Sequence, residues 1–156
     1  MASSLSEPSK FNSRPGTRFL QPANLMTLCS PGSPSSGVLP ADVLVVEDDP
    51  LIALDFAETI RELGVMSVRT AAAVACALAL IVERVPDFAF LDVELLEERS
   101  FSVAERLEDL SIPFAFVTAH ARESVLPAKF LRSPVLLKPF TRDALESLLR
   151  NWREAV

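Results

Sequence analysis

The sequence predicts an α/β protein with a five-stranded parallel sheet and helices on both of its faces. Two observations predict this class. Short apolar runs that suit strands buried on both faces recur between residues 43 and 137, and a stretch with helical spacing of apolar residues follows each of them. Strands that alternate with helices need right-handed crossovers, which produce a parallel sheet. At 156 residues and 49% hydrophobic composition, the chain has room and apolar surface for one ordinary domain.

The first strand and helix carry clear local signals. Residues 43–46 read Val-Leu-Val-Val, which is typical of a buried parallel strand. Asp49 is a good helix N-cap and Pro50 a good first helical residue. An apolar face follows, and Gly64 is placed to end the helix. These signals predict one strand followed by one helix.

The same unit recurs four more times. The further strands are expected at 65–69, 88–91, 113–117 and 135–137, and the further helices at 71–84, 100–110, 121–131 and 141–153. Thr70 is the predicted cap of the second helix, and Pro127 is placed to break the fourth. A doubly wound sheet of this kind is expected to have the strand order 2-1-3-4-5.

Residues 1–40 differ in composition from the rest of the chain. They hold six of the twelve prolines and three of the four glycines, together with nine serines. Such a segment cannot bury enough apolar surface to offset its chain entropy, so we expect a disordered tail at 1–40 and a domain at 41–156. The tail is either a docking segment, a passive extension, or a stretch upstream of a translation start at Met26 or later.

Composition also excludes several functional classes. The net charge of −6 and the pI near 4.8 oppose adhesion to a phosphate backbone, so no nucleic-acid partner is expected. No apolar run reaches the roughly 18 residues that a membrane span requires. Cys29 and Cys76 lie in unrelated contexts, which favours neither a disulfide nor a cysteine metal site. We therefore expect a cytoplasmic protein.

Polar side chains follow four of the predicted strands. Glu47 and Asp48 follow the first, Asp92 the third, Thr118 the fourth and Lys138 the fifth. Ligands of open α/β sheets bind at the carboxyl ends of the strands, and these four strands are neighbours in the expected order. Clustered carboxylates repel one another unless a hard cation such as Mg²⁺ lies among them. An aspartate, a hydroxyl and an ammonium beside Mg²⁺ suit phosphoryl transfer, with an aspartyl phosphate as the expected species.

Four stretches carry the residues at the predicted strand ends, namely VLVVEDDPLI (43–52), PDFAFLDVEL (86–95), IPFAFVTAH (112–120) and PVLLKPF (134–140). These stretches resemble the receiver domains of two-component response regulators, and the resemblance covers about residues 41–154. The resemblance implies the flavodoxin-like receiver fold. It implies five roles, namely Asp92 as phosphoacceptor, Glu47 and Asp48 with Asp92 as Mg²⁺ ligands, the backbone carbonyl of Glu94 as a further ligand, Thr118 as switch hydroxyl and Lys138 as phosphate-binding lysine. Asp49 is assigned to capping, and Pro139 resembles the family's cis-proline position.

The chain looks like the single-domain regulators of alphaproteobacteria, because its sequence ends with the fifth helix. The resemblance therefore implies a stand-alone regulator, not a turnover enzyme, that takes a phosphoryl group from a histidine kinase or phosphotransfer protein. It would signal, relay or discharge phosphate through protein contacts, with a homodimer as a further option. Phe130, Leu131 and the surface of the fifth helix are the expected contact elements, unless they belong to the core.

Two alternatives remain open at this point. One is a receiver-like interaction module that works without phosphorylation. The other is a small phosphatase with an aspartate nucleophile, although such enzymes resemble an Asp-x-Asp pattern that this chain lacks after its first strand.

Some positions depart from the family pattern. Val135 stands where most receivers have an aromatic switch residue, and residues 94–99 contain neither the usual proline nor glycine. Residues 114–118 partly resemble a Phe-Ala-Thr-Gly-Xaa-Tyr signature, but the chain has no tyrosine. His120, the only histidine, is expected near Glu94, where the pair would modulate the lifetime of the aspartyl phosphate; the alternative is an inert loop histidine.

Overall fold

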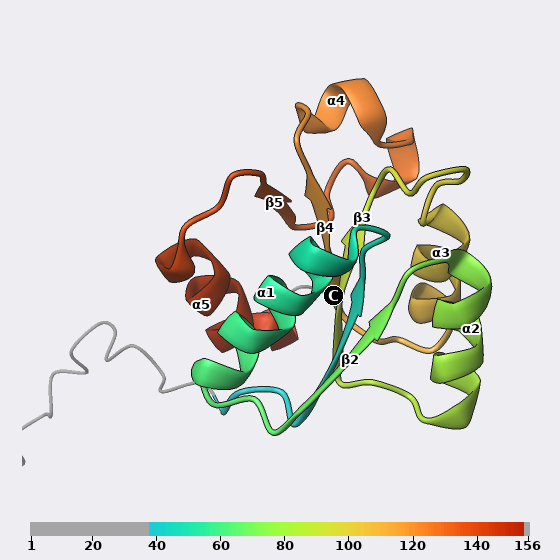
Figure 1. Ribbon diagram of the computed structural model, residues 1–156. Coiled ribbons are helices and arrows are strands. Elements are labelled where there is room, and N and C mark those ends of the chain that lie inside the picture. Colours follow the sequence, from blue (N-terminus) through green and yellow to red (C-terminus); the bar gives the residue numbers. More distant parts are fainter. Residues whose placement is uncertain (1–37, 155–156) are drawn as a thin grey trace, which may run out of the picture. The chain divides into compact units, whose positions relative to one another are not determined.

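The computed structural model describes residues 38–154, and within this range it contains the predicted α/β fold (Figure 1). The parallel strands are β1 (Asp42–Val46), β2 (Ser67–Ala71), β3 (Phe88–Asp92), β4 (Phe114–Thr118) and β5 (Val135–Leu137). The helices are α1 (Pro50–Glu62), α2 (Val74–Glu83), α3 (Phe101–Asp109), α4 (Arg122–Val125) and α5 (Arg142–Arg150), with short 3-10 helices η1 (Ala128–Phe130) and η2 (Trp152–Glu154). The order across the sheet is β2-β1-β3-β4-β5, which confirms the predicted order.

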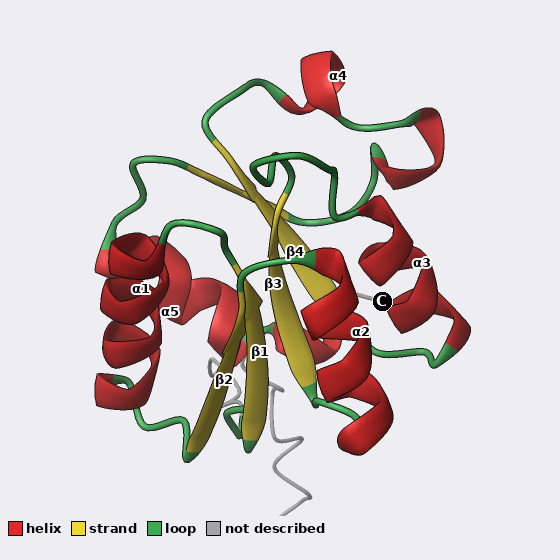
Figure 2. Cartoon of the chain, turned by 45° about the vertical axis from the view of Figure 1, so that its right-hand side comes forward, coloured by secondary structure: helices red, strands yellow, loops and turns green. Residues whose placement is uncertain are grey.

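Helices cover both faces of the sheet, and each pair of helices encloses its own part of the core (Figure 2). On the face covered by α1 and α5, the buried residues include Phe56, Ile60 and Leu145. On the face covered by α2 and α3, they include Ile81 and Leu107. β1, β3 and β4 are buried along their whole length, which explains why their sequences are apolar except at one end of each strand, at Asp42, Asp92 and Thr118.

The start and end of α1 are as the sequence predicts. The Asp49 carboxylate accepts hydrogen bonds from the backbone N–H groups of Leu51 (2.8 Å) and Ile52 (3.2 Å), and Pro50 occupies the first turn. Gly64 follows the helix with a φ of +109°, a conformation that residues with a β-carbon rarely adopt. The Asp49 cap fixes the direction in which the chain passes from the end of β1 into α1.

The second strand lies two residues later than predicted. The prediction of a strand at 65–69 with Thr70 as the cap of the next helix was wrong. Thr70 lies inside β2, which ends at the following residue. The pairing with β1 decides the bounds, since Asp42 pairs with Ser67 and the ladder continues unbroken to the ends of both strands. Val65 is buried beside α1 in the preceding turn.

The four helices after α1 are shorter than predicted, and α2 and α3 lie inside the predicted ranges 71–84 and 100–110. The helix expected at 121–131 is interrupted at Pro127, and Leu126 before it is extended, as residues that precede proline tend to be. The break expected at Pro127 is therefore confirmed. The helix expected at 141–153 ends at Arg150 and continues, after a break, as η2.

Contacts of the domain begin before residue 41. The carbonyl of Val38 accepts a hydrogen bond of 2.8 Å from Nε1 of Trp152, and Leu39 packs against the core under α1 and α5. The rest of the predicted tail, including Cys29, lies outside the described residues. Between residues 38 and 154, no helix is long and apolar enough to cross a membrane.

Candidate functional site

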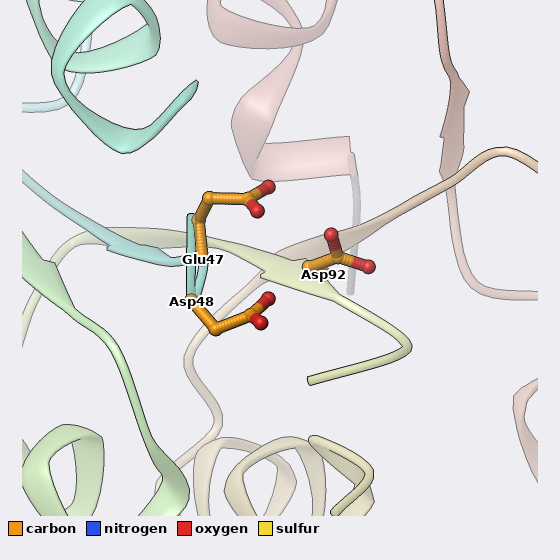
Figure 3. Close-up of side chains that lie close together, drawn as sticks. All are labelled: Glu47, Asp48 and Asp92. Carbon is orange, nitrogen blue, oxygen red and sulfur yellow. The ribbon is translucent and has the colours of Figure 1, made fainter. Parts of the chain in front are cut away.

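Three carboxylates meet at the carboxyl ends of β1 and β3. Glu47, Asp48 and Asp92 each offer one oxygen, and these oxygens lie within 4.8 Å of one another. Figure 3 shows the side chains of Glu47 and Asp48 extending from the end of β1 toward the side on which Asp92 lies. The predicted convergence of these strand ends is therefore what the fold produces.

The local backbone holds Glu47 firmly. Its N–H donates to the carbonyl of Ala71 at the end of β2 (3.0 Å), and its Oε1 accepts from the N–H of Asp49 (3.3 Å). Glu47 is only 4% exposed and Asp92 9%, whereas Asp48 is half-buried. Two of the three carboxylates are thus largely removed from water. An unpaired charge is costly in such a buried position.

Lys138 pairs with both of the buried carboxylates and offsets one of their two negative charges. Its Nζ lies 2.6 Å from Oε2 of Glu47 and 2.5 Å from Oδ2 of Asp92. The lysine directly follows β5 and is joined to Pro139 by a cis peptide bond, as the family resemblance predicts. One ammonium therefore bridges residues that are 91 and 46 positions away from it in the chain.

Burial and charge shift the pKa values of this group in a consistent way. Burial raises the pKa of Glu47, and the neighbouring charge of Asp92 raises it further, against the lowering effect of Lys138. Burial on its own lowers the pKa of Lys138, but its hydrogen bonds to Asp92 and Glu47 outweigh burial and leave the pKa above its usual value. The lysine is therefore charged at neutral pH.

Thr118 is buried at the end of β4, with 2% of its surface exposed. Its Oγ1 accepts a hydrogen bond of 3.1 Å from the N–H of His120. Its carbonyl accepts from the N–H of Lys138 at 2.8 Å, which joins the ends of β4 and β5. A movement of the threonine side chain would thus directly alter the hydrogen bond to the backbone of His120.

Glu94 lies beside the same cluster. Its N–H donates to Oδ1 of Asp92 at 3.0 Å. It also forms an isolated antiparallel bridge with Arg99, but the hydrogen bonds of that bridge use the carbonyls of Val93 and Glu98. The bridge therefore does not engage the Glu94 carbonyl that the resemblance assigns to a metal.

The predicted proximity of His120 and Glu94 is present. Nε2 of His120 lies 3.3 Å from Oε2 of Glu94, and both side chains are about half exposed, at 56% and 45%. Arg99 approaches the other oxygen of the same carboxylate at 3.4 Å. The contact of Arg99 with Glu94 was not predicted from the sequence. The only sequence feature that set this segment apart was the absence of proline and glycine from residues 94–99.

The contact elements expected from sequence need a correction. Phe130 is fully buried among other phenylalanines, with its ring centroid 5.3 Å from that of Phe116, so it belongs to the core. Leu131 is exposed. Val135 is half-buried against the core under α2 and α3 and carries no ring that could rotate between two positions.

The donor set suits a hard divalent cation. Carboxylate oxygens, with a backbone carbonyl beside them, are the ligands that Mg²⁺ prefers, whereas softer metals favour nitrogen or sulfur. The crowding of Glu47 and Asp92 around one lysine also leaves the half-buried Asp48 without that neutralising partner. The residues present therefore fit a Mg²⁺ ion.

Comparison with known proteins places this site in a family. Residues 43–150 match the response regulator receiver domain. The sensory transduction protein LytT of Enterococcus faecalis is 30% identical over 112 residues, which are 70% of this chain and 46% of LytT. The chain thus spans about half the length of the curated relatives it matches.

Solved structures agree with this match. SdrG from Sphingomonas melonis is 40% identical with a TM-score of 0.61, and the alignment covers 69% of this chain and 91% of SdrG. The response regulator PhyR from Brucella abortus is 27% identical with a TM-score of 0.64, over 76% of this chain and 49% of PhyR. Receiver domains serve two-component systems, accept a phosphoryl group on an aspartate and bind Mg²⁺ at an acidic pocket. The chain belongs to the response regulator receiver domain family.

Proposed function

We propose that this chain is a stand-alone response regulator that accepts a phosphoryl group on Asp92 from a histidine kinase or phosphotransfer protein. The observation that carries the proposal is the position of Lys138, whose ammonium joins Asp92 to Glu47 inside a cluster of three carboxylates. Glu47, Asp48, Asp92 and the carbonyl of Glu94 would hold Mg²⁺. The 91% coverage of SdrG supports the stand-alone organisation.

The residues of the site have complementary tasks in phosphoryl transfer. A carboxylate oxygen of Asp92 attacks the phosphorus of the donor, the new O–P bond forms, and the donor leaves with the electrons of the bond that breaks. Bound Mg²⁺ would supply positive charge for the transferring oxygens. Lys138 turns from its carboxylate partners to the phosphoryl group, and the Thr118 hydroxyl donates a hydrogen bond to it.

Output follows from the same contacts. When the Thr118 hydroxyl donates to the phosphoryl group, its Oγ1 moves and its hydrogen bond with the N–H of His120 is altered. The segment that contains His120 and α4 shifts as a result, which moves a pre-existing equilibrium toward the active state. Val135 provides no aromatic ring for this step, so the backbone after β4 would carry the signal to a protein partner.

A direct test is incubation of the purified chain with acetyl phosphate and Mg²⁺, read on a phosphate-affinity gel. A shifted band that requires Mg²⁺ and Asp92 supports the proposal. A chain that stays unmodified with small donors and with kinases would favour the phosphorylation-independent interaction module. Catalytic turnover of phosphorylated substrates, beyond one phosphoryl group per chain, would favour the phosphatase.

The affinity for Mg²⁺ should fall as the pH is lowered from neutral, and the fall should begin at a higher pH than an ordinary glutamate ligand would cause. Because the pKa of Glu47 is raised, this carboxylate takes up a proton at a higher pH than an ordinary glutamate, whose pKa is about 4.3. The protonated carboxyl is a poorer metal ligand, so affinity is full above the raised pKa and is lost below it. Isothermal titration calorimetry at several pH values measures this. In Glu47→Gln the affinity should be lower at pH 7 and should vary less over the same range.

The pair of His120 and Glu94 should control how long the phosphoryl group lasts. The pair stands about half exposed at the mouth of the site, where it limits the approach of water to the aspartyl phosphate. We expect faster dephosphorylation in both His120→Ala and Glu94→Ala, by about a few-fold, followed by loss of the shifted gel band after removal of the donor. Arg132→Ala, an exposed residue outside this pair, is the control. Rates unchanged in both variants would make His120 an inert loop histidine.

A further inference from the structure

The segment after Asp92 forms a tight turn without the residues that usually make turns. Residues 94–99, the 94–99 turn, contain neither glycine nor proline. The N–H of Leu95 donates to the carbonyl of Glu98 at 3.0 Å, and the N–H of Ser100 donates to the carbonyl of Val93 at 3.4 Å. Since no residue with special backbone preferences fixes this turn, contacts with the rest of the domain must hold it.

Three contacts hold the 94–99 turn to the domain. The side chain of Leu95 is buried in the core under α2 and α3. Nη1 of Arg99 donates to the carbonyl of Val125 at the end of α4 (3.2 Å). Oε1 of Glu98 accepts a hydrogen bond of 2.8 Å from the backbone N–H of Val74 in the first turn of α2. The turn is therefore fixed to both neighbouring helices.

The contact of Glu98 satisfies a need of α2. The first N–H groups of any helix lack partners within the helix, and the N-cap of α2 is Ala73, whose side chain cannot accept a hydrogen bond. A carboxylate from the 94–99 turn takes the place of that missing cap. Its negative charge also suits the positive end of the helix dipole.

The 94–99 turn also positions the acidic cluster. Glu94, its first residue, donates its N–H to Oδ1 of Asp92 and presents the carbonyl that we assign to the metal. A shift of the turn would move both groups at once. Partners behind the direct ligands of a metal commonly set its affinity because they orient those ligands.

We propose that Glu98 is a positioning residue for the divalent-cation site. Its carboxylate accepts a hydrogen bond from the N–H of Val74 and thereby holds the 94–99 turn in one orientation. In this orientation Glu94 and Asp92 can both bind the cation. This inference rests on the proposed function, since it concerns the affinity of that same site for Mg²⁺. The first turn of α2 would then help to position the residues that bind Mg²⁺, which phosphorylation requires.

Glu98→Ala should lower the affinity for Mg²⁺ by about tenfold in calorimetric titration. Glu98→Gln keeps an oxygen at the same position and should stay within about twofold of the wild type after correction for the lost charge. Glu97→Ala supplies that correction, because Glu97 is an exposed neighbour with the same charge. An equal loss of affinity in Glu98→Ala and Glu97→Ala would overturn the proposal by reducing the effect to charge.

A second variant removes the donor in place of the acceptor. Val74 is the first residue of α2, where proline is tolerated, and the extended backbone of Ala73 before it is compatible with proline. Val74→Pro deletes the N–H, so adding Glu98→Ala to it should cause little further loss of Mg²⁺ affinity. Losses that simply add in the double variant would contradict the tether.

Hydrogen exchange of the Val74 amide, measured without metal, tests the contact independently. Exchange should be faster in Glu98→Ala and close to wild type in Glu98→Gln; equal exchange in all three chains would overturn the tether. A wild-type chain that binds no Mg²⁺ overturns the proposed function and this inference with it. A wild type that binds Mg²⁺, with unchanged affinity in Glu98→Ala, overturns the inference alone.

Discussion

Replacement of Lys138 by methionine should slow phosphorylation by acetyl phosphate about 10²–10³-fold at saturating Mg²⁺. The ammonium lies 2.5 Å from Oδ2 of Asp92, so it is already beside the oxygens where the phosphoryl group would be attached. Methionine keeps most of the side-chain volume but removes the charge and all three donors. The rate is measured from the growth of the shifted band on a phosphate-affinity gel.

The same substitution should raise the affinity for Mg²⁺, although it slows phosphorylation. Lys138 occupies one oxygen each of Glu47 and Asp92 and repels a cation, so without it the site becomes more negative and binds Mg²⁺ more tightly. In the absence of metal, the loss of their partner from the buried carboxylates should lower the free energy of unfolding by about 3 kcal/mol, the lower end for a buried pair, because the Lys138 side chain is 22% exposed. Added Mg²⁺ should restore this stability.

Lys129→Met is the matched control for this prediction, because Lys129 pairs with Glu105 on the surface. Its phosphorylation rate should equal that of the wild type. A Lys138→Met chain that is phosphorylated at the normal rate, or that loses Mg²⁺ affinity, would contradict the role assigned to the lysine.

Asp92→Asn and Asp48→Asn should fail in distinguishable ways. Asp92→Asn replaces the nucleophilic carboxylate by a neutral amide, so phosphorylation should fall on the order of 10⁶-fold, below detection, at every Mg²⁺ concentration. Asp48→Asn removes only a metal ligand, which should weaken Mg²⁺ binding by at least about tenfold. High Mg²⁺ should therefore restore phosphorylation of Asp48→Asn and leave Asp92→Asn inactive.

The measurement is the initial phosphorylation rate as a function of Mg²⁺ concentration for both variants. Asp55→Asn, which changes an exposed aspartate on α1, should behave like the wild type. Rescue of Asp92→Asn by Mg²⁺ would mean that another residue accepts the phosphoryl group. Asp48→Asn that cannot be rescued would mean that Asp48 does more than bind metal.

The sequence was sufficient to predict the sheet and the residues at its carboxyl edge. Each buried strand contains a continuous apolar run, and a polar residue directly after such a run must lie at the strand end. Asp92 and Lys138 could therefore be placed near each other despite their separation of 46 residues. The Asp49 cap followed from equally local signals, whereas the strand order followed from the expected doubly wound fold class.

The errors arose where long-range contacts outweigh local preference. Thr70 is a good helix cap in isolation, yet the ladder between β1 and β2 places it inside a strand. The bond from Val74 to Glu98 spans 24 residues and joins two segments without turn or cap signals. Phe130 lies among other aromatic rings that only the folded chain brings together.

The most direct test of the central claim is to locate the phosphoryl group in the chain. After incubation with acetyl phosphate and Mg²⁺, borohydride reduction converts an aspartyl phosphate to a stable product that peptide mass spectrometry can place. The account predicts a single modified residue, Asp92, and no modification when Mg²⁺ is chelated. Modification of another residue, or modification at Asp92 that is independent of Mg²⁺, would contradict it.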